Sequence, residues 1–217
     1  MPSHPYRREL PHVFPPGVPI FVTWRLFGSL PVRRIRSATN PKISAGQCFR
    51  DVDWAHDRTV SGALWLRDAR VARMVCEEIE SGASYRGQYV LHEFVVMPNH
   101  VHMLVFPSAE MAEVMHHIKL RTAQQANRIL RRVGQSFWQS ESFDHWCRSV
   151  QEMVKVRQYI VMNPVKAGLA RRPQDWPWCS FSRKLARRRG ELPVALPKGA
   201  SASQKATESI SMPHKAP

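Results

Sequence analysis

The sequence has few cysteines and few acidic residues, and it has no long apolar run. Its four cysteines are scattered along 217 residues without a C-x-x-C pair. This usage fits a reducing cytoplasm and argues against a disulfide scaffold or a cysteine-based zinc finger. No secretory h-region follows Met1, and no apolar run reaches transmembrane length. We therefore expect a soluble, cytoplasmic protein with no membrane partner.

The shortage of acids leaves a large excess of positive charge. There are 32 lysines and arginines against 17 aspartates and glutamates, which gives a formal net charge of +15. This excess makes a polyanion, most simply a nucleic acid, the first candidate for a partner, although a protein can be basic without binding one. Apolar residues form 43% of the chain, which is enough for a substantial core.

Hydrophobic patterns and turn signals predict one α+β domain. The expected strands are residues 20–27, 88–97, 100–106 and 136–139. The expected helices are residues 69–81, 108–132 and 149–163. The order β-α-β-β-α-β matches a ferredoxin-like split βαβ with a four-stranded antiparallel sheet, followed by an additional C-terminal helix that bears Tyr159.

Local signals set the expected ends of these elements. Asp68 is placed to cap the first helix and Gly82 to end it. Pro164 is expected to stop the last helix, because proline disfavours helical geometry in the residue before it. Residues 141–147 are expected to form a connecting loop.

The remaining segments divide the chain into three parts. Residues 1–19 form a proline-rich, basic leader, residues 20–182 the folded domain, and residues 183–217 a basic tail that we expect to be disordered. Residues 28–60 are interpreted as a basic loop with a short helix around residues 48–56.

Two histidines lie in the expected strand at residues 100–106. Side chains alternate between the faces of a strand, so His100 and His102 point the same way. Buried imidazoles need a partner for each ring nitrogen, and two on one face converge on one small volume. The pair is either a pocket for a divalent metal or a pair of hydrogen-bonded core histidines.

The expected helix at residues 149–163 carries a second polar group. On a helical wheel Tyr159 lies in the middle of a polar face, with Asn163 one turn on and Lys155 one turn back. The face expected to be buried consists of Val150, Met153, Val154, Val156, Ile160 and Val161. By itself, Tyr159 could equally be a rim residue with its hydroxyl in water.

Together these residues suit attack on a phosphate. Tyrosine is a weak nucleophile at its free pKa, but it can attack a phosphorus centre when a metal polarises the phosphate. Two imidazoles leave a divalent ion under-coordinated, and the amide oxygen of Asn163 is a candidate third ligand. A metal held there would bring a bound phosphate within reach of Tyr159.

Four segments resemble those of one family, the single-tyrosine (HUH) transposases. Residues 97–104, Met-Pro-Asn-His-Val-His-Met-Leu, resemble its His-hydrophobic-His signature, and residues 159–169 resemble its tyrosine-helix signature. Residues 62–68 and 175–180 are similar to flanking segments of one branch, the REP-associated tyrosine transposases. The resemblance covers roughly residues 20–182, and the two signatures together are specific.

The resemblance implies a mechanism and a substrate. It implies magnesium or manganese bound by His100, His102 and Asn163. It implies that Tyr159 attacks single-stranded DNA and leaves a 5′-phosphotyrosine adduct and a free 3′-hydroxyl. It also implies hairpin substrates of the repetitive extragenic palindrome (REP) kind and a protein that acts as a monomer or a homodimer. Residues 28–61 do not match the family well.

Other residues are candidates for DNA binding. They are Lys155, Arg121, Arg128, Arg132, Trp176 and Trp178. The three arginines lie on the polar face of the helix at residues 108–132, where they could follow phosphates or could simply be solvated. The two tryptophans could stack on unpaired bases or could anchor their segment on the domain.

A non-catalytic nucleic-acid-binding module on the same fold is the alternative function. RNA-recognition domains share this architecture, and the basic charge suits either function. A pure binder has no need for the complete set of two histidines, Asn163 and Tyr159. The sequence therefore favours a metal-dependent transposase or nicking-joining enzyme that acts on single-stranded DNA hairpins.

Overall fold

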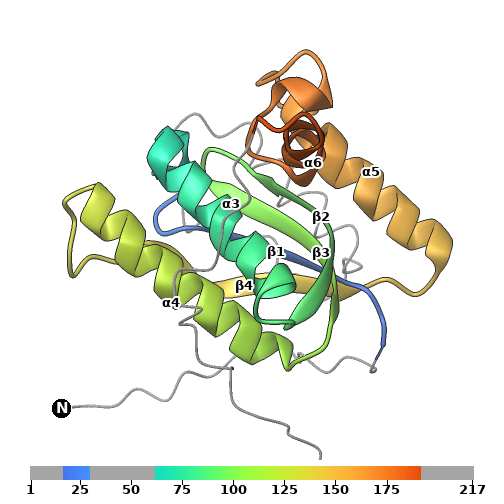
Figure 1. The fold of residues 1–217 in the computed structure, drawn as a ribbon. Coiled ribbons are helices and arrows are strands. Elements are labelled where there is room, and N and C mark those ends of the chain that lie inside the picture. The colour runs from blue at the N-terminus through green and yellow to red at the C-terminus, as the bar shows by residue number, and fades with distance from the viewer. Residues whose placement is uncertain (1–16, 30–61, 192–217) are drawn as a thin grey trace, which may run out of the picture.

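A four-stranded antiparallel sheet forms the centre of the protein (Figure 1). The computed structural model describes residues 17–29 and 62–191. The strands are β1 (Ile20–Leu26), β2 (Tyr89–Val96), β3 (His100–Pro107) and β4 (Trp138–Trp146), in the spatial order β2-β3-β1-β4. The predicted α+β class and the ferredoxin-like order of elements are therefore confirmed.

Helices cover both faces of this sheet (Figure 1). α3 (Ala69–Ser84) and α4 (Met111–Ile129) pack on one face and α5 (Val150–Lys166) packs on the other. Alternate residues of β1 show the division, because Val22 and Trp24 join the core beneath α3 and α4, whereas Phe21 joins a smaller cluster with Ile160 of α5. The smaller elements are η1 (Trp65–Arg67), η2 (Pro173–Asp175) and α6 (Ser180–Arg188).

Parts of the expected organisation lie outside the described residues. These are most of the leader (1–16), the basic loop with its short helix (30–61) and the end of the tail (192–217). In the part of the chain that the structure describes, no helix combines the length and apolarity needed to cross a bilayer.

The first helix begins as predicted but ends later. Asp68 caps α3, since its side chain accepts a hydrogen bond from the backbone N–H of Arg70 at 2.9 Å. The expected stop at Gly82 is wrong, because α3 continues to Ser84. A Cβ at Gly82 would lie 2.1 Å from Tyr89 Oη, so this glycine allows β2 to approach the helix closely.

The fourth strand is longer than predicted. Residues 141–147 were expected to form a loop, but β4 runs from Trp138 to Trp146 and pairs with β1 along its length, with Ile20 opposite Trp146 and Thr23 opposite Phe143. Polar side chains alternate only weakly with apolar ones here, because β4 is an edge strand and is half-exposed.

The expected end of the third helix at Asn163 is also wrong. α5 continues through Pro164 to Lys166. Proline inside a helix removes one backbone hydrogen bond and crowds the preceding turn, but only two residues of α5 follow it, so the cost falls in the last turn.

The start of the expected disordered tail is helical. Residues 183–188 belong to α6, whose Arg183 is buried and lies 2.7 Å from Glu80 of α3. The preceding segment is fixed to the edge of the sheet, since the Trp178 carbonyl accepts a hydrogen bond from the Val96 N–H at 2.8 Å. A basic composition suggested a solvated tail, but the ion pair with a distant glutamate holds this segment on the domain.

Candidate active site

The two histidines of β3 are buried on the face that α5 covers. His100 is 1% exposed and His102 is fully buried. Their Nε2 atoms lie 2.9 Å apart, so the two rings point at the same small volume, as the strand alternation predicts.

Each ring is held from behind by another side chain. Asn99 Oδ1 lies 2.6 Å from His100 Nδ1, and Thr23 Oγ1 of β1 lies 2.8 Å from His102 Nδ1. Thr23 is directly opposite His102 in the β1–β3 pairing. Such partners fix the orientation and the tautomer of an imidazole and leave its other nitrogen for a ligand.

The hydrogen bonds that link the two rings to each other, to Asn99 and to Thr23 can be assigned consistently without a metal. His100 Nδ1–H donates to Asn99 Oδ1, so His100 Nε2 carries a lone pair and can accept from His102 Nε2–H. Thr23 then donates to His102 Nδ1. If both Nε2 atoms bind a metal, His102 must carry its proton on Nδ1, and the Thr23 hydroxyl can accept that bond instead. Thr23 therefore suits both states.

α5 buries only part of the face predicted by the wheel: Ile160 is buried and Met153 and Val156 pack against the smaller cluster as expected, but the start of that face is not buried. Val150 and Val154, expected in the core, are 68% and 53% exposed. Asn163 is fully buried, and Tyr159 packs its ring against His102 with the ring centroids 5.5 Å apart. The sheet beneath α5 presents both apolar side chains and the two histidines, so the helix buries Ile160 together with Asn163.

Asn163 connects the tyrosine to the histidines. Its Nδ2 donates a hydrogen bond to Tyr159 Oη at 2.9 Å and lies 3.4 Å from His102 Nε2. Its Oδ1 is buried and has no hydrogen-bond partner among the described residues. An unpaired buried carbonyl oxygen is costly, which points to a ligand that this oxygen would bind.

The donor set fits a divalent cation. Two ligands at right angles on an octahedral ion, with bonds of about 2.1 Å, lie about 3.0 Å apart, close to the separation of the two Nε2 atoms. A half-turn of the Asn163 amide exchanges its oxygen with its nitrogen and would bring the oxygen to the histidine side. In residues 17–29 and 62–191 no three His, Cys, Asp or Glu side chains gather as ligands, so a third ligand from these residues must be of another type.

The predicted arginines are not brought to this site. Arg121, Arg128 and Arg132 lie on or just after α4, across the sheet from the histidines. Arg121 pairs with Glu78 at 3.2 Å, and the Arg132 guanidinium stacks 3.4 Å from the centre of the Trp65 ring. Lys155 is exposed on α5.

The two tryptophans anchor their segment on the domain. Trp176 Nε1 donates to the Val96 carbonyl at 3.0 Å, and its ring packs on the cluster beneath α5. Trp178 packs against the larger core. Both side chains are partly buried, and their contacts with the domain support the anchoring interpretation.

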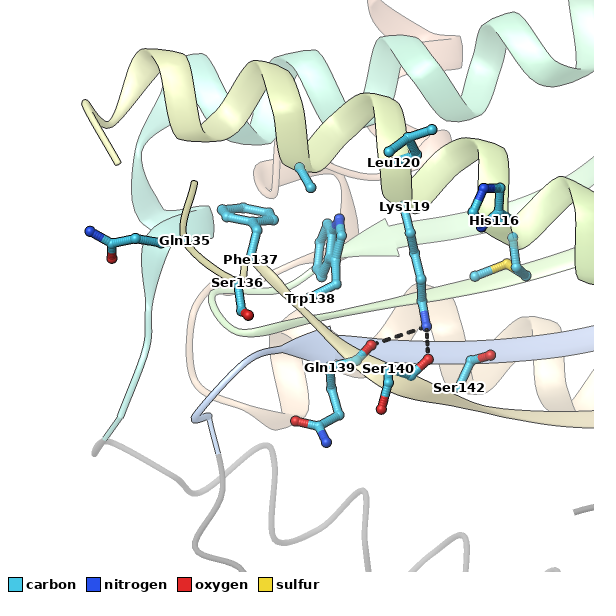
Figure 2. Close-up of a pocket in the computed structure, with 12 residues that line it drawn as sticks. His116, Lys119, Leu120, Gln135, Ser136, Phe137, Trp138, Gln139, Ser140 and Ser142 are labelled. Carbon is cyan, nitrogen blue, oxygen red and sulfur yellow. Dashed lines mark hydrogen bonds between the residues drawn. The ribbon is translucent and has the colours of Figure 1, made fainter. Parts of the chain in front are cut away.

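The described pocket of about 570 Å³ is separate from the histidines. Figure 2 shows it between α4 and the start of β4, with Phe137 and Trp138 in its wall. Lys119 points across it and donates to the carbonyls of Gln139 at 3.2 Å and Ser140 at 2.9 Å. The lysine occupies carbonyls that a further strand could otherwise pair with, which protects this edge of the sheet.

The two residues that hold the histidine rings were not predicted from the sequence. Asn99 directly precedes His100 in the motif, but nothing in the sequence shows that its side chain contacts the ring. Thr23 could have been found from alternation, because it shares a face of β1 with Phe21. Its pairing with His102 depends on strand register, which the sequence does not show.

Comparisons with known proteins find similarity to transposases. A family model described as "Transposase IS200 like" matches residues 66–163, which include β3 and end at Asn163. A REP-associated tyrosine transposase of Escherichia coli K12 is 26% identical to the chain over 101 residues. The sequence of this chain is similar to those of tyrosine transposases.

The matches to individual transposases are partial. The match covers 46% of this chain and 58% of the E. coli transposase. A putative REP-associated tyrosine transposase of Haemophilus influenzae is 27% identical over 101 residues, covering 42% of this chain and 57% of that protein. The chain thus spans less than two thirds of the length of these curated transposases.

A solved transposase structure shares the fold. It is described as a REP-associated tyrosine transposase bound to a REP hairpin, and it matches with a TM-score of 0.52 over 94% of this chain and 100% of its own. The sequence identity is 20%, so the likeness establishes the shared fold.

Proposed function

We propose that this chain is a metal-dependent transposase or endonuclease that cleaves and rejoins single-stranded DNA at hairpins through a 5′-phosphotyrosine intermediate. The observation that carries the proposal is the convergence of His100, His102, Asn163 and Tyr159, which come from β3 and α5. The family relation supports transposase activity, and the relative bound to a REP hairpin supports a hairpin as the partner.

Tyr159 is the proposed nucleophile. Its ring lies edge-on to Phe21 and His102, and Asn163 holds its hydroxyl, so the oxygen has a fixed position. In the proposed step the Tyr159 oxygen forms a bond to phosphorus and the bond from phosphorus to the 3′ oxygen breaks. The phenol proton leaves to solvent and the 3′ oxygen takes up a proton. Attack by a 3′-hydroxyl on the phosphotyrosine reverses these changes and rejoins a strand.

His100, His102 and Asn163 are the proposed ligands of magnesium or manganese. The cation would supply positive charge that polarises the phosphate. Asn99 and Thr23 hold the two rings in place before any ligand arrives, so little reorganisation is required on binding. We propose that the catalytic domain begins at residue 20, as expected, and that it includes α6 beyond residue 182.

A covalent-adduct assay tests the proposal. The substrate is a labelled hairpin with single-stranded flanks, taken from palindromes beside the protein's own gene, in the presence of manganese. We expect a protein–DNA adduct that survives denaturing electrophoresis and is absent with Tyr159→Phe. Tyr85→Phe is the matched control, because Tyr85 is 58% exposed at the end of α3, away from the histidines.

The result also separates the two functions considered from the sequence. If wild-type protein binds the hairpin but forms no adduct with manganese or magnesium, it is a non-catalytic binding module. An adduct that persists in Tyr159→Phe would show that another residue is the nucleophile.

A further inference from the structure

We propose that Arg25 of β1 binds a nonbridging oxygen of the phosphate that Tyr159 attacks. This inference rests on the proposed function and adds to it a residue that supplies a fixed positive charge from the protein. It concerns the same face of the sheet, at the position on β1 that pairs with His100.

The strand pairing places Arg25 beside the histidines. Arg25 is directly opposite His100 in the β1–β3 pairing, just as Thr23 is opposite His102. Residues directly opposite in antiparallel strands share a face, and their Cβ atoms lie about 4.5–5.5 Å apart. The contact between Thr23 and His102 confirms that this face of β1 points to the site.

Two backbone features fix the position of Arg25. The N–H of Leu26 donates to the carbonyl of Asn99 at 2.8 Å, which ties the end of β1 to the residue before His100. On its other side, the pairing of β1 with β4 is irregular between Trp24 and Leu26. Such irregularities redirect side chains and are common beside active sites.

The guanidinium of Arg25 lacks a carboxylate partner. It is partly buried, and among residues 17–29 and 62–191 no Asp or Glu forms an ion pair with it. Burial removes part of the hydration of the charged guanidinium and so lowers the pKa of Arg25 from its usual value. Two other arginines differ in this respect, since Arg157 pairs with Glu93 at 3.0 Å and Arg183 with Glu80 at 2.7 Å.

A desolvated cation without a counter-ion costs stability, and an arriving anion would reverse that cost. Guanidinium groups bind phosphate oxygens through two parallel N–H groups, which fixes the orientation of the phosphate as well as its position. A phosphate bound between the histidines and Arg25 would lie on the face of the sheet that α5 covers, where Tyr159 of α5 could attack it. Arg25 would also stabilise the negative charge that builds up on the oxygens during attack.

The test compares Arg25→Gln with Arg73→Gln. Arg73 is exposed on α3, across the sheet, and its replacement removes the same charge. With manganese, we expect Arg25→Gln to slow adduct formation about 100-fold, and Arg73→Gln to leave it unchanged. Arg25→Lys, which keeps the charge but not the paired N–H groups, should restore only part of the rate.

Thermal unfolding separates this role from a structural one. Because Arg25 has no ion pair to lose among the described residues, Arg25→Gln should unfold at the same temperature as wild type or higher. If Arg25 were structural, the Arg25→Gln variant would unfold at a lower temperature than wild type, and that result would overturn the proposal. An adduct rate for Arg25→Gln within about threefold of the Arg73→Gln rate would also overturn it.

A binding measurement in EDTA keeps the inference distinct from the proposed function. Without metal we expect Arg25→Gln to bind the labelled oligonucleotide about 10-fold more weakly than Arg73→Gln. Replacing the cleaved phosphate with an uncharged methylphosphonate should abolish this difference. Equal affinities, or a difference that survives the methylphosphonate, would overturn the role of Arg25 even if wild type forms the adduct. If wild type forms no adduct, the proposed function fails, and equal EDTA affinities would still reject Arg25 as a phosphate ligand.

Discussion

The two faces of the sheet are built from the same strands but have different chemistry. Beneath α3 and α4 the buried side chains are almost all apolar, as in the cluster that contains Val22, Trp24 and Ile79. Beneath α5 the same strands present Thr23, His100 and His102. One face therefore supplies the stability of the domain, and the other can hold polar groups that would weaken an ordinary core.

The largest expected effect is on the α5 face. His100→Ala removes one proposed metal ligand, so that His102 Nε2 no longer has the second imidazole beside it. Wild-type protein should unfold at a higher temperature with manganese, because the folded state alone presents the complete site. The variant should lose this shift, as measured by differential scanning fluorimetry with and without EDTA. A shift of full size in the variant would rule out His100 as a ligand.

A change on the α3 face should have the opposite pattern. Ile79→Ala leaves a cavity in the larger core, where Ile79 is fully buried. We expect a loss of about 2–5 kcal/mol in the free energy of unfolding, measured by urea denaturation. The manganese-induced shift should persist wherever the variant is folded. Loss of metal response at the concentration that saturates wild type would show that the two faces are coupled.

Thr23→Val tests the support of the histidine rather than the ligand itself. Valine keeps the shape but removes the hydroxyl that lies 2.8 Å from His102 Nδ1. We expect manganese affinity to fall by about 10–100-fold, as for other residues that orient metal ligands. Isothermal titration calorimetry measures the affinity. Thr122→Val is the control, since its buried hydroxyl donates to the Ile118 carbonyl and accepts from Trp138 Nε1 in the larger core, away from the histidines.

The smallest expected effect is at the start of α3. Hydrogen bonds from Arg70 lower the pKa of the Asp68 carboxyl to about 2. Its stabilisation is therefore complete above the unfolded pKa near 3.8 and is lost as the pH falls through about 2. Asp68→Ala should cost about 1 kcal/mol at neutral pH, whereas Asp68→Asn should retain most of the cap. Urea denaturation at pH 7 and pH 2.5 measures both, and an equal loss in the two variants would contradict the capping role.

The sequence predicted the elements whose signals are local. The strand alternation at residues 100–106 correctly placed both histidines on one face, and Asp68 correctly marked the start of α3. The ends were less predictable, because Gly82 and Pro164 are usual stop signals that other contacts overrode. Gly82 serves the close approach of Tyr89, which no local pattern reveals.

Features that depend on distant partners were not predictable. Counting apolar residues on α5 placed Val150 and Val154 in the core, but the polar sheet selected the face with Asn163. Arg183 is buried only because Glu80 faces it from α3. Arg25 gave no signal in the sequence, since its position opposite His100 follows from strand register alone.

Pro164 has a mechanical consequence for the candidate site. In an α-helix the backbone N–H of residue 164 would donate a hydrogen bond to the carbonyl of Ile160, but proline has no N–H and cannot form this bond. The missing hydrogen bond lies between the turn that carries Tyr159 and the turn that carries Asn163. The two groups therefore lie on one helix, but the backbone between them is less rigid than in a helix with all its hydrogen bonds. The amide of Asn163 can be adjusted toward a ligand with little displacement of the phenol.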